Sequence, residues 1–329
     1  MSLLVLVKLS YFVAATLFLL GLQRMASPKT ARSGIQWAGA GMLIATFATF
    51  FLPGLHNIGL MVAAIVIGVA ANWAWGKKVA ITDMPQMVAL FNGMGGGAAA
   101  AIGAVELVRW SAAGQSPGMV PGVLAVLGSL IGAVSLTGSI IAWAKLDGRM
   151  DKRYTFPGQQ WFNAAIALAA VVCGAMALQT LAMPWIVAFF VLALALGVLM
   201  TLPIGGADMP VVISLYNAFT GLAVAFEGYV LGNEALIIAG TMVGAAGMLL
   251  TRLMAKAMNR KISNVLFSDF GGGSGEMQEI GGSMKPIEAA DVAAMMAYAE
   301  RVVIVPGYGM AVAQAQHKIW ELTQRLTER

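Results

Sequence analysis

Nine hydrophobic stretches, separated by short polar loops, fill the first four fifths of the chain. They lie near residues 3–22, 35–52, 58–75, 87–108, 120–143, 162–181, 185–202, 211–231 and 235–254. Each is long enough for an apolar helix to cross a hydrocarbon layer about 30 Å thick. The pattern therefore predicts an α-helical polytopic membrane domain, which we place at residues 1–261.

The composition agrees with a membrane protein. Of the 329 residues, 59% are hydrophobic and only 11% are charged, and the mean hydropathy is +0.81. Soluble domains carry roughly 25% charged residues, so a soluble class is excluded. The single Cys173 and two scattered histidines exclude an intrachain disulfide and give no pattern of metal ligands, so no metal site is predicted.

The net charge of +5 comes from Lys and Arg residues that gather after the first, third, fifth and ninth hydrophobic stretches. The loops after the second, fourth, sixth and eighth stretches contain one basic residue, Arg109, and the neutral His56. By the positive-inside rule, the N-terminus is predicted outside the cell and the chain after residue 255 in the cytoplasm. Because the basic residues flank hydrophobic spans, the positive charge indicates a membrane topology and not nucleic-acid binding.

One motif occurs twice, and each copy predicts the start of a membrane helix. The first copy is Asp-Met-Pro at 83–85, with Asn92 nine residues after the aspartate, and the second is Asp-Met-Pro at 208–210, with Asn217 at the same spacing. Aspartate followed by proline in the first helical turn is typical of a helix start. At a rise of about 1.5 Å per residue, each asparagine lies roughly 12 Å into the membrane.

Polar side chains at this depth are costly unless they are paired or hydrated, which favours a functional site. The alternative is that the two amides join neighbouring helices by hydrogen bonds and do nothing else. The repetition of the whole motif favours function. Both helices are predicted to run outward from the cytoplasmic face, which suggests that the third to fifth spans are repeated in the seventh to ninth.

Other polar residues lie in the same spans. Ser135, Thr137 and Ser139 place hydroxyls in the fifth span, where they serve a proton path or bond to their own helix. Glu106 and Glu227 fall toward the outer ends of the two asparagine helices. They are interpreted either as carboxylates that collect protons or as solvated charges at helix ends.

After the last span the character of the sequence changes. A Gly-rich segment at 262–286 is predicted to be a flexible linker, and an amphipathic helix follows from Pro286. Residues 301–315 then read as a buried strand, a Gly-x-Gly turn and a helix, which is the context of a dinucleotide-binding site. The predicted cofactor-binding residues are Pro306, Gly307, Tyr308, Gly309, Met310, Ala311 and Val312.

Within this turn, Gly307 makes the bend and Gly309 lets the backbone approach a pyrophosphate at the helix N-terminus. Val312 stands where a third glycine is common. Residues 287–329 are therefore expected to begin a nucleotide-binding domain that this chain truncates. The residue that distinguishes NADP from NAD is expected beyond Arg329.

Three segments resemble the β subunit of bacterial proton-translocating NAD(P) transhydrogenase, namely 205–212, 256–260 and 305–316. The likeness extends over the whole chain. It implies nine membrane helices followed by a Rossmann-like α/β domain that binds NADP(H). It also implies an α subunit that binds NAD(H), a dimer of α/β units in the bacterial inner membrane, and Re/Si-specific hydride transfer coupled to proton translocation. The chain alone is then expected to be inactive.

The resemblance implies that Asp208 and Asn217 lie on the proton path or its coupling, with Ser139 nearby. Some members of the family have histidine where this chain has Asn92. Because an amide does not titrate, either water carries the proton past Asn92 or the α subunit supplies a titratable group. The alternative function is a secondary transporter with a regulatory nucleotide-binding tail.

Overall fold

The computed structural model describes residues 3–150, 152–258, 287–305, 307, 310 and 315–328. The predicted linker at 262–286 lies outside these residues. The chain divides into two compact units. We call residues 1–79 with 83–270 the membrane unit, and residues 80–82 with 271–329 the tail unit.

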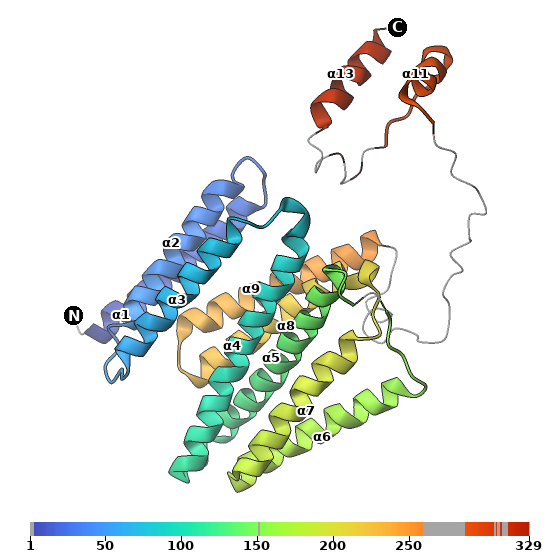
Figure 1. Ribbon diagram of the computed structural model, residues 1–329. Helices are drawn as coiled ribbons and strands as arrows, with labels where there is room; N and C mark the ends of the chain where they lie inside the picture. The colour runs from blue at the N-terminus through green and yellow to red at the C-terminus, as the bar shows by residue number, and fades with distance from the viewer. Residues whose placement is uncertain are drawn as a thin grey trace. The chain divides into compact units, whose positions relative to one another are not determined.

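Every predicted span forms a helix whose ends lie within a few residues of the predicted ones (Figure 1). The helices are α1 (Leu3–Met25), α2 (Ala31–Thr49), α3 (Ile58–Gly76), α4 (Met84–Ala113), α5 (Met119–Leu146), α6 (Gln159–Thr180), α7 (Met183–Thr201), α8 (Met209–Val230) and α9 (Glu234–Ala257). Among the described residues, eight of them are long and apolar enough to cross a membrane. The exception is α2, whose first two turns contain Arg32, Ser33 and Gln36.

The two Asp-Met-Pro motifs start helices as predicted. In each copy a short 3-10 turn, η1 (Ile81–Asp83) or η2 (Gly206–Asp208), leads directly into α4 or α8. Asp83 and Asp208 occupy the N-cap position, and the proline lies in the first helical turn. Neither aspartate makes the capping hydrogen bond to its own helix. The motif therefore fixes the helix boundary mainly through the proline.

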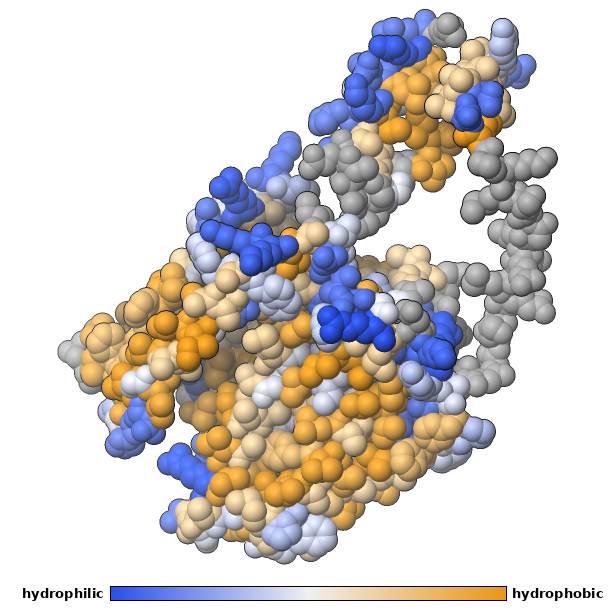
Figure 2. All heavy atoms as spheres, in the orientation of Figure 1, coloured by the Kyte–Doolittle hydropathy of each residue, from blue (hydrophilic) through white to orange (hydrophobic). Residues whose placement is uncertain are grey.

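Helix α8 is the centre of the membrane unit, packed against α9, α5 and α4. Two thirds of its most apolar window, 67%, is buried, whereas the corresponding share of α3 is 0%. Figure 2 shows hydrophobic residues covering the visible side of the membrane unit, with hydrophilic residues gathered mainly at its ends. An apolar surface of this extent matches a protein whose solvent is lipid.

In the tail unit, the amphipathic helix predicted after Pro286 forms as α11 (Ala289–Tyr298), and a second helix, α13, covers Gln316–Thr327. Residues 301–305, predicted to be a strand, have no assigned secondary structure and pair with no strand among the described residues. A parallel β-strand is defined by its backbone hydrogen bonds to a neighbouring strand. The α/β character of the tail is therefore not displayed by the described residues, which are helical or irregular.

Candidate functional site

Asn92 lies on α4 and is almost fully buried, with 8% of its surface exposed. Its Nδ2 donates to Ser139 Oγ at 2.9 Å and to Ser135 Oγ at 3.3 Å, both on α5. Ser135 Oγ in turn lies 2.6 Å from Thr220 Oγ1 on α8. We call these four residues the amide–hydroxyl cluster. It joins the three helices α4, α5 and α8 inside the membrane unit.

Two backbone carbonyls also accept hydrogen bonds from the cluster. Ser135 Oγ donates to the carbonyl of Tyr216 at 3.2 Å, and Thr220 Oγ1 donates to the carbonyl of Asn92 at 3.5 Å. Between Ser135 and Thr220, either hydroxyl can be the donor. Asn92 Oδ1 is buried and has no partner among the described residues. An unsatisfied buried acceptor costs about 1–3 kcal/mol, so this oxygen is a site where a water molecule or another donor would bind.

Glycines on both helices allow this close contact. A Cβ on Gly96 of α4 would come 2.9 Å from Gly132 O and from Ser135 Cβ on α5. A Cβ on Gly93 would come 3.1 Å from Ser139 Cβ. Any larger residue would push α4 and α5 apart. The glycines therefore set the separation at which Asn92 reaches both serines.

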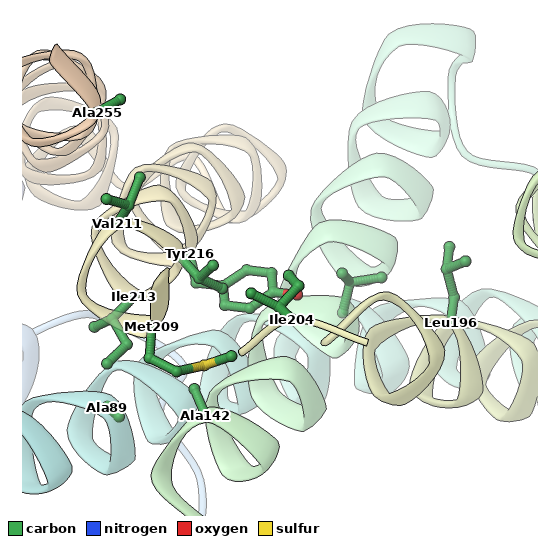
Figure 3. Packing of buried hydrophobic residues seen from close by; sticks show 11 residues of the cluster. Ala89, Ala142, Leu196, Ile204, Met209, Val211, Ile213, Tyr216 and Ala255 are labelled. Carbon is green, nitrogen blue, oxygen red and sulfur yellow. The ribbon is translucent and has the colours of Figure 1, made fainter. Parts of the chain in front are cut away.

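A second polar contact lies toward the Asp-Met-Pro end of α8. Tyr216 Oη is 2.6 Å from Thr201 Oγ1 at the end of α7, and Thr201 donates to Gly197 O at 2.8 Å. Tyr216 is therefore the donor of its pair. Its ring lies against Gly138 of α5, where a Cβ would come 2.5 Å from the ring atom Cζ. Figure 3 shows this ring reaching from α8 toward Ile204 in the buried cluster.

The turn between α7 and α8, which carries Asp208, is held by two cations. Lys145 Nζ at the end of α5 donates to the carbonyls of Leu202 and Ile204, the latter at 2.6 Å. The Arg153 guanidinium lies against Gly205, where a Cβ would come 2.6 Å from Nε. Asp208 itself is only 9% exposed. The turn is thus connected to α5 and to the segment after it.

The predicted site residues fall into two groups. Asn92 and Ser139 are in direct contact, as the amide–hydroxyl cluster shows. Asn217 is half-buried, and its side chain makes no hydrogen bond to another described residue, although it lies one helical turn before Thr220. Sequence reasoning did not single out Thr220. Its spacing of three residues from Asn217 was the available signal, since residues three apart share a helix face.

In the tail unit, only Gly307 and Met310 of the predicted cofactor-binding residues are described; Pro306, Tyr308, Gly309, Ala311 and Val312 are not. Met310 N donates to Gly307 O at 3.1 Å, so the chain turns here as expected.

The side chains before this turn alternate between exposed and covered positions. Val303 and Val305 are 73% and 86% exposed, whereas Val302 and Ile304 line an apolar groove of about 450 Å³ with Ile319 and Trp320 of α13 and three neighbouring residues. This alternation is that of a strand covered on one face by a helix.

Comparison with known proteins identifies relatives along nearly the whole chain. The family model described as NAD(P) transhydrogenase beta subunit matches residues 7–329. A protein named NAD(P) transhydrogenase subunit beta from Rhodospirillum rubrum is 41% identical over 327 residues, covering 96% of this chain and 70% of the relative. A second sequence of the same name, from a defined strain of that species, has the same identity and coverage.

Proposed function

The chain belongs to the NAD(P) transhydrogenase beta subunit family, and on this premise we propose that its membrane unit conducts the protons coupled to hydride transfer between NADH and NADP⁺. The observation that carries the proposal is the amide–hydroxyl cluster, buried between three membrane helices with Asn92 Oδ1 unsatisfied. If the amide only joined helices, both of its ends would be expected to have partners. An open acceptor among hydroxyls instead supports a hydrated path. The same family membership favours this function over the secondary transporter.

The turn before α8 is the proposed coupling element. Lys145 and Arg153 contact this turn. Asp208 ends the turn, and the buried Tyr216, two helical turns further along α8, accepts a hydrogen bond from Ser135. A displacement of this turn would therefore reach the amide–hydroxyl cluster through Tyr216, whose carbonyl accepts from Ser135. We infer that nucleotide binding to the tail unit moves this turn and so opens or closes access to the cluster.

NADP(H) is proposed to bind the turn at 306–312 in the tail unit, and NAD(H) the partner α subunit. Residues 287–329 would then start a Rossmann-like domain, joined to the membrane domain at 1–261 by the linker at 262–286. The alternating exposure of residues 302–305 supports this, because the exposed Val303 and Val305 would form the second face of a strand, which a further helix covers in a parallel α/β sheet.

The protein is proposed to lie in the inner membrane of a bacterium. The distribution of Lys and Arg places its N-terminus outside and its tail unit in the cytoplasm. The ion pair between Lys8 and Glu234, 3.1 Å, supports placing the starts of α1 and α9 on the same side. An α subunit that adds membrane helices is the proposed partner, in a dimer of α/β units. Asn217 and α3, which has no buried residue, leave surface for such helices.

The experiment that tests this function is proton pumping by the α/β enzyme in sealed vesicles, compared between wild type and Asn92→Leu. The leucine removes the polar centre of the cluster and would dewet it, so we expect hydride transfer to lose its dependence on the proton gradient. Thr16→Val is the control, because the Thr16 hydroxyl on α1 donates to Phe12 O of its own helix and to no other described residue. Undiminished pumping by Asn92→Leu would contradict the proposed path.

A further inference from the structure

A carboxyl group that the amide–hydroxyl cluster does not include is buried near the other end of α8. Glu227 is 0% exposed, and neither of its carboxylate oxygens has a hydrogen bond of good geometry to a described residue. Glycines make the space for it. A Cβ on Gly103 of α4 would come 2.6 Å from Glu227 Oε1, and a Cβ on Gly128 of α5 would come 2.5 Å from the same atom.

Ser129 of α5 lies in the same gap. It is also 0% exposed, its Oγ is also without a well-formed hydrogen bond, and both Ser129 Oγ and Glu227 Oε1 would collide with a Cβ on Gly103. Three buried oxygens that lack good partners thus meet between α4, α5 and α8. Buried polar groups are nearly always satisfied in folded proteins, and a membrane interior makes each exception costly. A carboxyl group kept there therefore indicates a function.

A second acidic residue lies between Glu227 and the end of the membrane unit. Glu106 is one helical turn beyond Gly103, the α4 residue against which Glu227 packs, and its side chain is 14% exposed. Glu106 pairs at 3.5 Å with Arg109, whose side chain is 75% exposed. On α9, the charge at this end is Glu234, which pairs with Lys8. Along α4, the acidic residues therefore run from the buried Glu227 toward exposed charge.

In the opposite direction, most of the buried residues between Glu227 and the amide–hydroxyl cluster are small. Glu227 follows Thr220 by seven residues on α8, a rise of roughly 10 Å. Ala223 and Ala225 are buried in this part of α8, Ala100 and Ala133 are buried on α4 and α5, and Gly132 lies against Ala100. Helices that approach through such small residues leave little apolar bulk between the two polar groups.

We propose that Glu227 is the proton-carrying group of the outer half of the path. It accepts a proton from outside water by way of Glu106 and then releases it toward Thr220, which restores the carboxylate. Hydroxyls and amides at neutral pH do not hold an additional proton, whereas a carboxyl group binds and releases one. Glu227 therefore supplies the titratable group of the path, because the amide of Asn92 does not titrate. The inference rests on the proposed function.

The competing role for Glu227 is that of a permanently protonated side chain that only packs, and Glu227→Gln separates the two. Glutamine has the size of the protonated acid but does not release a proton. We expect proton pumping by the α/β enzyme in sealed vesicles to fall about a hundredfold, the lower range for loss of a proton-transfer group. NADP(H) affinity and thermal stability should stay at wild-type values, and Glu227→Asp should recover part of the pumping. Glu234→Gln, at the exposed ion pair, is the control and should pump normally.

A second measurement covers the case in which the glutamine variant does not assemble. Infrared difference spectra of the wild-type enzyme between acidic and alkaline buffer should contain the C=O band of a buried carboxyl that loses its proton, shifted in D2O. The band should persist in Glu234→Gln. A wild type that pumps but lacks this band, or a Glu227→Gln enzyme that pumps normally, would overturn the role of Glu227 alone. A wild type that does not pump would instead refute the proposed function.

Discussion

Each copy of the Asp-Met-Pro motif starts a helix, but the two helices lie in different environments. In the first copy, Met84 is 48% exposed, but Asn92 is buried and bonded to two serines. In the second, Met209 is fully buried, but Asn217 is half-buried and has no hydrogen-bond partner among the described residues. In α4 the buried residue of the motif is therefore the asparagine in the middle of the helix, whereas in α8 it is the methionine at the helix start. The repeated motif determines where each helix begins, and the helices packed around it determine which of its residues are buried.

The largest effect is expected from Asn217→Leu in the α/β enzyme. We predict that proton-coupled turnover is abolished while NADP(H) binding persists, because an apolar side chain would dewet the path beside Thr220. Since Asn217 has no hydrogen bond to lose within the described residues, the thermal midpoint should not fall. Pumping in vesicles and unfolding in detergent measure the two quantities. Normal pumping would leave only Asn92 as a functional amide.

The next largest effect tests the close approach that buries Asn92. Gly96→Val would place carbon atoms against Gly132 O and Ser135 Cβ, and we predict a destabilisation of about 1–3 kcal/mol, as for other overpacked cores. Gly68→Val on α3 is matched, since no atom lies within 4 Å of its added Cβ. Thermal unfolding of the purified membrane unit measures both. Equal midpoints would mean that α4 and α5 separate without cost.

The third prediction compares the two aspartates. Asp208→Asn should lower proton-coupled turnover on the order of tenfold, because Asp208 is 9% exposed at the turn held by Lys145, and couplings between sites commonly have this size. Asp83→Asn, at the exposed start of α4, should change turnover less than twofold, which is about 0.4 kcal/mol. Steady-state hydride transfer with and without a proton gradient provides the comparison. If the two variants behaved alike, the α7–α8 turn would have no special part in coupling.

The smallest effect is expected from Asn92→His. Imidazole can donate to Ser139 as the amide does, so activity should persist. Histidine titrates near pH 6.5 when unperturbed, so a new dependence of turnover on pH should appear between about pH 5 and 8. The pH profile of coupled turnover, compared with that of wild type, measures it. An unchanged profile would place residue 92 away from the moving proton.

A separate prediction concerns the partner. The chain expressed alone should transfer no hydride, because the proposed NAD(H) site is on the α subunit. An assay of hydride transfer by the purified chain with both nucleotides present measures this. Transfer by the isolated chain would refute this division of cofactors.

The candidate site was only partly predictable. Asn92 and Ser139 were identified and are in contact, because an amide and a hydroxyl at membrane depth are informative by themselves. Glu227 had two interpretations, a proton collector or a solvated helix end, and burial excludes the solvated one. The sequence did not indicate a role for Ser129, Thr220 or Lys145, because that role depends on contacts with other helices or turns.

What the sequence determined by itself was local. Hydrophobic runs and the Asp-Met-Pro starts defined the nine helices, since in lipid the backbone must satisfy its own hydrogen bonds and a long apolar segment has no alternative to a helix. The tertiary structure decided which faces of those helices meet. Glycine contacts bring Asn92 to Ser139 and enclose Glu227, but nothing in the periodicity distinguishes those glycines from Gly68, which touches nothing. The hydrogen bonds within a helix form between near neighbours in the chain, whereas Asn92 and Ser139 are 47 residues apart. For that reason the sequence predicted the helices and single residues of the site, but not the contacts between those residues.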